Sequence, residues 1–222
     1  MSTASNQSLA TGRDKLAALL KTARVVPVLT IDRLEDAVPL ARALVAGGVR
    51  VLEVTLRTPV AIEAAKAIMA EVPDAIVGIG TILNAADLAR AEALGAKFGI
   101  SPGATPDLLK AAAASPLPLA PGIATASELM MALAHGFDLV KFFPAEQAGG
   151  LKGLRALAGP FPDVRFCPTG GIGEANAASW LNEPNVLAVG GSWLCPAADI
   201  RSGNWTGITA ICNRTMKLLK PA

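Results

Sequence analysis

Short apolar runs alternate with longer segments of helical periodicity along almost the whole chain, at intervals of roughly 20–25 residues. Eight runs have the length and composition of buried strands; they lie at 25–29, 51–57, 76–81, 98–102, 117–122, 139–145, 164–169 and 186–190. A helical segment at about 8–24 precedes them. Strands that alternate with helices build parallel β–α units, and eight such units close into a barrel. The pattern therefore predicts an α/β protein, a (β/α)8 TIM barrel with an extra N-terminal helix.

The length of the chain agrees with one such barrel, because its 222 residues fall within the ~200–250 that a single barrel domain takes. No linker or shift in composition divides the chain. We therefore expect one domain over 1–222, made of the N-terminal helix at about 8–24 and the barrel at 25–222. Asn84 and Thr125 stand where two of the helices should begin, and both residue types are typical N-caps.

Charge and cysteine content exclude several classes of protein. The net charge is +2 and no basic run is present, so nucleic acid is not an expected partner. Cys167, Cys195 and Cys212 are odd in number and far apart, which is typical of reduced thiols in the cytoplasm. With His135 as the single histidine, we expect no metal site. The polar stretch 1–14 does not have the pattern of a signal peptide, and no membrane helix is expected.

One of the apolar runs, 139–145, contains a lysine between apolar neighbours. An unpaired buried charge is very costly, so the amine of Lys141 must pair with an acid, reach water or lose its proton. A lysine that is held out of water as the free amine attacks carbonyl groups. We interpret Lys141 as a nucleophile. The alternative is a structural lysine that is ion-paired or extends its ammonium group to solvent.

The second run places two charged side chains on one face of a strand. Because side chains alternate along a strand, Glu53 and Arg57 share the face opposite the apolar residues at 52, 54 and 56, which should meet the outer helices. Barrel interiors are built in layers from alternate strands, so Glu53 can share or adjoin a layer with Lys141 of the sixth strand. The alternative is an ion pair that only holds the interior together, although such pairs stabilise less than apolar side chains.

The seventh and eighth runs both end in two glycines beside a hydroxyl residue: Thr169-Gly170-Gly171 and Gly190-Gly191-Ser192. In TIM barrels the active site lies at the carboxyl ends of the strands, and the loops after strands seven and eight often bind phosphate. Glycines allow the backbone to approach a ligand closely, and the hydroxyl groups can add hydrogen bonds. We therefore expect a phosphate site there; the alternative is a pair of ordinary tight turns.

Several motifs resemble those of one enzyme family. They are VRVLEVTLRT at 49–58, VKFFPAE at 140–146, VRFCPTGGI at 164–172, GGSWL at 190–194 and ISPG at 100–103. Together they are similar to the class I aldolases that cleave 2-keto-3-deoxy-6-phosphogluconate (KDPG), a family that includes the 4-hydroxy-2-oxoglutarate aldolases. The resemblance covers about residues 20–200 and shows no departure at the positions discussed next.

This resemblance implies a lyase that works without a metal or another cofactor, through a Schiff base on lysine. It implies Lys141 as the Schiff-base residue and Glu53 as the acid and base. Arg57 and Thr81 would bind the carboxylate of the pyruvyl group, and Pro102 and Phe143 would line the pocket. The polar end and the phosphate of the substrate would be held by Thr169, Gly170, Gly171, Gly191 and Ser192.

The reaction implied is cleavage of KDPG to pyruvate and glyceraldehyde 3-phosphate, a step of the Entner–Doudoroff pathway, by a cytoplasmic homotrimer. The expected partners are small-molecule substrates, with no nucleic acid and no membrane. Two alternatives remain open at this point. One is a related aldolase acting on 2-keto-4-hydroxyglutarate or on an epimeric phospho-keto acid, and the other is a non-catalytic barrel that binds sugar phosphates.

Overall fold

The computed structural model describes residues 3–219, with their side chains except those of 3–11 and 13. Strands and helices alternate as the sequence predicts. The strands are β1 (Val25–Leu29), β2 (Val51–Thr55), β3 (Ile76–Gly80), β4 (Gly99–Ile100), β5 (Leu119–Ala120), β6 (Gly122–Ile123), β7 (Leu139–Phe142), β8 (Arg165–Pro168) and β9 (Val189–Gly191). The ends of the predicted domain, residues 1, 2 and 220–222, lie outside the described residues.

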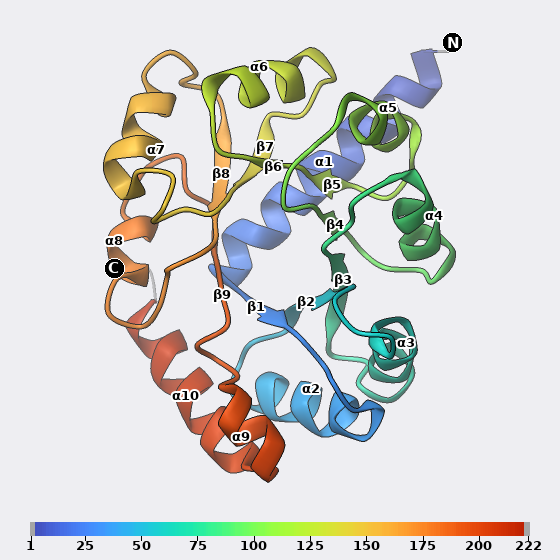
Figure 1. Cartoon of the computed structure of the whole chain (residues 1–222), viewed down its shortest axis with the longest axis vertical. Coiled ribbons are helices and arrows are strands. Elements are labelled where there is room, and N and C mark those ends of the chain that lie inside the picture. The colour runs from blue at the N-terminus through green and yellow to red at the C-terminus, as the bar shows by residue number, and fades with distance from the viewer. Residues whose placement is uncertain (1–2, 220–222) are drawn as a thin grey trace.

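The helices surround the strands, and α1 runs behind them (Figure 1). Helix α1 (Thr3–Ala23) begins five residues before the segment predicted at about 8–24. The others are η1 (Leu34–Asp36), α2 (Ala37–Ala46), α3 (Ala61–Glu71), α4 (Ala85–Ala93), α5 (Pro106–Ala114), α6 (Ala126–Ala134), α7 (Gly150–Ala158), α8 (Ala177–Leu181), α9 (Ala197–Ser202) and α10 (Trp205–Leu218).

All strand pairings are parallel, and the sheets curl. Six strands form one sheet in the order β5-β4-β3-β2-β1-β9, and three form a second in the order β6-β7-β8. Isolated parallel bridges join Phe166 to Val186 and Thr169 to Gly190, so the β8 side of the second sheet contacts the β9 side of the first. The structure is therefore a curled parallel α/β fold with helices on its outside (Figure 1).

The fifth strand, predicted at 117–122 with prolines interrupting it, is divided by the structure into β5 and β6 around Pro121. Proline has no N–H group to donate to a neighbouring strand. The carbonyl of Pro121 still accepts from the Lys141 N–H at 2.9 Å, so the chain continues along β7 after the interruption. The two short strands pair in different sheets: β5 with β4, and β6 with β7.

Two hydrophobic cores follow from the alternation of side chains along the strands. Leu52 and Val54 of β2 are fully buried against the outer helices, whereas Val51 faces the inside of the curled sheet. This inner core includes Leu16 and Leu20 of α1. Helix α1 thus closes the end of the fold at which the strands begin, and an accessible site on the inner face must lie at the carboxyl ends.

The predicted helix starts at Asn84 and Thr125 are confirmed. The side chain of Asn84 accepts from the Asp87 N–H at 2.9 Å, and Thr125 forms a capping box with Glu128. Such caps satisfy backbone N–H groups that have no partner within the helix. None of the helices within residues 3–219 combines the length and the apolar character that crossing a bilayer requires.

Candidate active site

Lys141 and Glu53 meet inside the curled sheet, at the positions that strand alternation predicts. The Nζ atom of Lys141, on β7, donates to Oε1 of Glu53, on β2, across 3.4 Å. Only 2% of Lys141 and 1% of Glu53 is exposed. The ring of Phe143 also faces the amine, with its centroid 5.0 Å from Nζ. A buried amine therefore has a carboxylate and an aromatic face as close neighbours.

Glycine at position 80 makes room for the carboxylate of Glu53. A Cβ atom at Gly80 would lie 2.2 Å from Oε1 of Glu53, which is far inside contact distance. On the other side of the site, a Cβ atom at Gly122 would lie 2.3 Å from the carbonyl of Pro102. Gly122 pairs with Lys141 in the sheet, so Pro102 is held against the strand next to the lysine. Both glycines are required by close approach rather than by backbone conformation.

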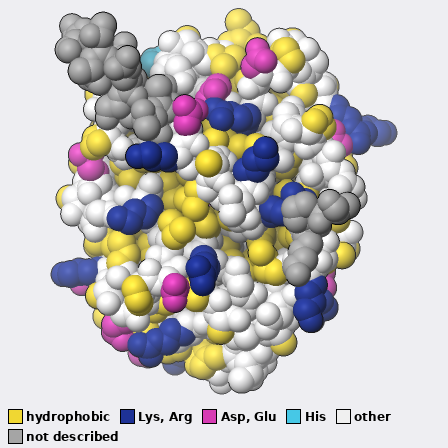
Figure 2. Space-filling model, turned by 180° about the vertical axis from the view of Figure 1, so that it is seen from behind, with side chains coloured by type: hydrophobic (Ala, Val, Ile, Leu, Met, Phe, Trp, Pro, Cys, Tyr) yellow, Lys and Arg dark blue, Asp and Glu magenta, His cyan; other side chains and the backbone are white. Residues whose placement is uncertain are grey.

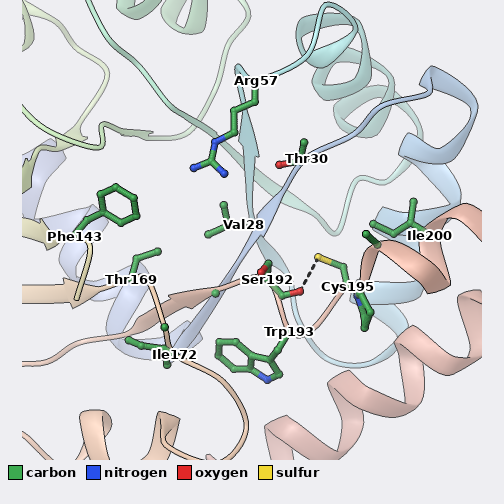
Figure 3. A pocket seen from close by; sticks show the side chains of 15 residues that line it. Val28, Thr30, Arg57, Phe143, Thr169, Ile172, Ser192, Trp193, Cys195 and Ile200 are labelled. Atoms are coloured by element: carbon green, nitrogen blue, oxygen red, sulfur yellow. Dashed lines mark hydrogen bonds between the residues drawn. The ribbon is translucent and has the colours of Figure 1, made fainter. Parts of the chain in front are cut away.

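Arg57 lies two residues beyond the end of β2, which stops at Thr55 and is shorter than the predicted 51–57. Its side chain is exposed and extends into a cavity (Figure 3). The Nε atom donates to Oγ1 of Thr81 at 3.2 Å. Thr81 itself has a φ of +60°, a conformation that is rare and strained for a β-branched residue. The hydroxyl group that accepts from the guanidinium is therefore held by a residue with a strained backbone conformation.

The cavity has a volume of about 560 Å³ and is lined by residues at the carboxyl ends of β1, β2, β7, β8 and β9. Seven residues of the predicted site line it: Arg57, Phe143, Thr169, Gly170, Gly171, Gly191 and Ser192. Phe143 follows Lys141 by two residues, and Arg57 follows Glu53 by four, so the lysine and the glutamate lie deeper in the fold than these two residues of the cavity wall. A small carbonyl compound in the cavity would have the amine beneath it.

Glycines also shape the wall formed by β8 and β9. Gly170 and Gly171 have φ values of +105° and +75°, which L side chains rarely adopt. A Cβ atom at Gly190 would lie 2.2 Å from Oγ1 of Thr169, so the threonine can stand there only because residue 190 is glycine. Ser192 is exposed at the rim. This wall presents backbone and hydroxyl groups with little side-chain bulk.

A carboxylate outside the cavity, missed in the sequence, fixes the glycine loop after β8. Oε1 of Glu146 accepts from Nδ2 of Asn176 and from Nε1 of Trp180, each at 3.1 Å. The same Nδ2 atom of Asn176 donates to the carbonyl of Gly171 at 3.2 Å. The backbone N–H of Glu146 donates to the carbonyl of Gly170 at 3.1 Å. The turn after the lysine strand therefore holds the loop after β8.

Sequence reasoning also missed several residues of the cavity wall. Thr30 could have been found, because it is a polar residue directly after the first predicted strand, where functional side chains of such folds gather. The others carry no such signal, since they are apolar or lie in the loop after the last strand: Val28, Ile172, Trp193, Cys195, Pro196, Ala197 and Ile200.

The cysteines near the site are not suited to act as nucleophiles. Cys167 pairs with Lys141 in the sheet, and burial raises the pKa of its thiol to about 12. Burial likewise raises the pKa of Cys195, on the cavity wall, to about 12. Within the described part of the chain, no three His, Cys, Asp or Glu side chains are grouped so that they could hold a metal ion.

A second cavity, of about 690 Å³, lies on the opposite face, where α1 meets the beginning of β3. Seen from behind, this side of the molecule shows hydrophobic side chains between Lys and Arg side chains (Figure 2). Leu16, Leu19 and Ile76 line the cavity together with Lys15 and Lys97. No carboxylate lines it among the described residues, so no pairing like that of Lys141 and Glu53 exists there.

Fold and site together define an α/β protein built for carbonyl chemistry on a lysine. A buried amine and a carboxylate lie beneath a cavity that has a guanidinium at one end and a glycine-rich wall at the other. The amine can add to a carbonyl, and the carboxylate of Glu53 can take up and release protons. The guanidinium can bind a carboxylate of a ligand in bidentate geometry.

Comparison with known proteins agrees with this class. The model of the family "KDPG and KHG aldolase" matches residues 16–211. The KHG/KDPG aldolase of Escherichia coli K12 is 54% identical over 200 residues, which are 90% of this chain and 94% of the relative. The chain therefore belongs to the KDPG and KHG aldolase family.

Two solved structures show that the similarity extends to the three-dimensional fold. The KDPG aldolase from Legionella pneumophila, with pyruvate captured at low pH as a covalent carbinolamine intermediate, is 49% identical, with a TM-score of 0.87 over 90% of this chain and 97% of its own. The KDPG aldolase of Zymomonas mobilis ZM4 with 3-phosphoglycerate is 49% identical, with a TM-score of 0.86 over 91% of this chain and 95% of its own.

Proposed function

We propose that this protein is a class I aldolase that cleaves KDPG to pyruvate and glyceraldehyde 3-phosphate through a Schiff base on Lys141. The observation that carries the proposal is the contact of 3.4 Å between the buried Nζ of Lys141 and Oε1 of Glu53, beneath a cavity bordered by Arg57. Family membership supports the same reaction. The captured carbinolamine of the Legionella relative supports the same kind of covalent intermediate.

In the first half of the reaction, Lys141 acts as the nucleophile. Its neutral amine adds to the C2 carbonyl of the substrate, and the resulting carbinolamine loses water to give an iminium ion. Glu53, directly or through water, takes the proton of the C4 hydroxyl group. The C3–C4 bond then breaks, its electrons move into the iminium, and glyceraldehyde 3-phosphate leaves. An enamine of pyruvate remains on the lysine.

The second half returns the enzyme to its starting state. Glu53 gives the proton to C3 of the enamine, which becomes an iminium again. Water adds to this iminium, and hydrolysis releases pyruvate and the free amine of Lys141. The same carboxylate thus serves as base in one step and as acid in the next, which its contact with the lysine permits.

The other residues of the site hold the substrate in register with the amine. Arg57, steadied by Thr81, binds the carboxylate of the keto acid, and this contact fixes the C2 carbonyl above Lys141. Phe143 forms an apolar side of the cavity, whereas Pro102 is not among its lining residues and lies against Gly122, the sheet partner of Lys141. The polar end and the phosphate lie along the glycine-rich wall, which is made of Thr169, Gly170, Gly171, Gly191 and Ser192.

A second activity, cleavage of 2-keto-4-hydroxyglutarate to pyruvate and glyoxylate, is supported by the family model and by the E. coli relative, both of which name it with the first. The two substrates share the keto-acid end and differ at the end that faces the glycine-rich wall. The same lysine, glutamate and arginine would therefore serve both, and the wall would set the preference.

We infer three further properties of the whole protein. The curled sheets close into one (β/α)8 barrel over a single domain, an inference supported by the continuity of β5 and β6 at Pro121 and by the bridges between β8 and β9. The barrel assembles as a homotrimer and acts in the cytoplasm, as the sequence resemblance implies. Cross-linking or light scattering of the purified protein measures the number of subunits.

The direct test is release of pyruvate from KDPG, followed by a coupled lactate dehydrogenase assay. We expect turnover that survives exhaustive chelation and exceeds the rate with 2-keto-4-hydroxyglutarate at equal concentration. No pyruvate from either substrate would refute an aldolase function. Activity that is lost on chelation and restored by a divalent ion would point to a metal-dependent mechanism instead.

A further inference from the structure

Thr30 stands between the two ends of the cavity. It follows β1 directly, and the sheet order places β1 between β2, which leads to Arg57, and β9, which leads to Ser192. Its side chain is exposed and lines the cavity next to Val28, on the side to which Arg57 extends (Figure 3). Thr30 thus belongs to the part of the cavity wall between the strand that leads to Arg57 and the strand that leads to Ser192.

The hydrogen bonds around Thr30 fix the polarity of its hydroxyl group. Oγ1 of Thr55 donates to the carbonyl of Leu29 at 2.8 Å, and a carbonyl can only accept, so the single proton of Thr55 is used there. Thr55 is fully buried, which holds this bond in place. In the contact of 3.3 Å between the two hydroxyl groups, Thr30 is therefore the donor. Its free lone pairs are left on the cavity side.

While its proton is donated to Thr55, the oxygen of Thr30 offers only lone pairs to the cavity. In that arrangement it gives nothing to a phosphate or a carboxylate, which are themselves acceptors, and it suits a hydroxyl group of the substrate. In KDPG the proton of the C4 hydroxyl is needed by the base and C6 carries the phosphate. The hydroxyl group that remains between them is the one on C5.

We propose that Thr30 is a specificity-determining residue that accepts a hydrogen bond from the C5 hydroxyl group of the substrate, between the subsites for carboxylate and phosphate. This inference rests on the proposed aldolase function and extends it to a residue outside the sequence motifs. It gives the enzyme a preference for aldehydes with a hydroxyl group next to the carbonyl carbon, because C5 of KDPG becomes C2 of glyceraldehyde 3-phosphate.

The test compares two aldehydes in the synthetic direction, with pyruvate as the partner. Glyceraldehyde 3-phosphate has the hydroxyl group, and 3-oxopropyl phosphate lacks it and is otherwise the same. Thr30→Val removes the hydroxyl group of the protein and keeps its shape, while Thr30→Ser is the matched control that keeps the hydroxyl. Thr30→Ala removes the group in a second way, in case the valine variant does not fold.

We expect the kcat/KM for glyceraldehyde 3-phosphate, divided by the kcat/KM for 3-oxopropyl phosphate, to fall about 10-fold in Thr30→Val and in Thr30→Ala. This is the effect that the loss of one hydrogen bond to a bound substrate predicts. The ratio should stay within about 2-fold of wild type in Thr30→Ser, whose hydroxyl still accepts. An unchanged ratio in the valine and alanine variants would overturn the proposal, including the case in which activity falls equally with both aldehydes. Thr30 would then only shape the cavity.

Trapping of pyruvate with borohydride separates this proposal from the function on which it rests. Wild-type protein that forms no adduct and joins pyruvate to neither aldehyde would refute the aldolase itself. Wild-type protein that forms the adduct and joins both aldehydes, together with an unchanged ratio in the variants, would refute only the role of Thr30.

Discussion

Lys141 and Glu53 form the kind of buried pair that a protein rarely keeps for stability alone. Taking a carboxylate and an amine out of water costs several kcal/mol per ion, and apolar side chains of similar volume often stabilise as well or better. Here the pair lies below an open cavity, and Arg57 borders that cavity two residues beyond the end of β2, the strand that carries Glu53. Its position favours chemistry over a purely structural ion pair.

Glu53→Gln tests the proton transfer. Glutamine keeps the size and the hydrogen-bonding oxygen of the side chain but cannot take up a proton. We expect kcat to fall about 10²–10⁴-fold, the usual contribution of a positioned acid or base. Exchange of the pyruvate methyl protons with deuterium, measured by NMR, should fall in parallel because the same group serves both steps. Near-normal cleavage and exchange would assign the proton transfer to another group.

The structure also links elements that the sequence leaves apart, and Glu146 is the clearest case. It follows the lysine strand, yet its carboxylate binds the side chains of Asn176 and Trp180 beyond β8, and Asn176 binds the carbonyl of Gly171. Trp180 is fully buried, so its indole N–H depends on this acceptor. The loops after β7 and β8 thus form one hydrogen-bonded unit.

Glu146→Ala should loosen that unit and leave the indole N–H of Trp180 without its acceptor. We expect the free energy of unfolding to fall by about 1–3 kcal/mol, the usual cost of an unsatisfied buried donor. KM should rise more for KDPG than for 2-keto-4-hydroxyglutarate, since we propose that the glycine loop binds the phosphate. Urea unfolding and steady-state kinetics measure the two effects. Equal changes in KM for both substrates would show that Glu146 stabilises the fold without positioning the loop.

At the scale of the whole molecule, the position of the site follows from which end α1 closes. Leu16 and Leu20 pack with Val51 and Phe98 inside the curled sheet, so side chains fill the end at which the strands begin. Polar groups can reach solvent at the other end, and the cavity lies there. The three cysteines are all buried in the two hydrophobic cores.

Thiol chemistry reports on this packing. Burial raises the pKa values of Cys167, Cys195 and Cys212 to about 12, so almost no thiolate is present at neutral pH. We expect iodoacetamide to modify none of them in the native protein and all of them after unfolding, as mass spectrometry would show. Because the thiolate is the reactive form, labelling of native protein should stay slow even at pH values at which an exposed thiol is already deprotonated. Rapid labelling of Cys195 at neutral pH would mean that the cavity wall opens.

The local pattern of the sequence predicted most of the architecture, because parallel β–α units have a regular hydrophobic period and distinct helix caps. Strand alternation, together with the layering of barrel interiors, also predicted that Glu53 could share or adjoin a layer with Lys141. The prolines of the fifth run indicate an interrupted strand, but the sequence could not predict that its two halves pair in different sheets. Nor could it predict the contact of Glu146 with Trp180, because Glu146 lies in a turn and Trp180 on a helix, where strand alternation assigns no facing partner.

The central claim is that the amine of Lys141 forms an imine with a keto acid, and borohydride reduction in the presence of pyruvate tests it most directly. We expect the protein to lose activity and to carry one pyruvate-derived adduct, which peptide mass spectrometry maps to Lys141. Lys152, exposed on α7, is an internal control for non-specific reaction. An adduct on Lys152 or on any lysine other than Lys141, or no adduct at all, would contradict the account.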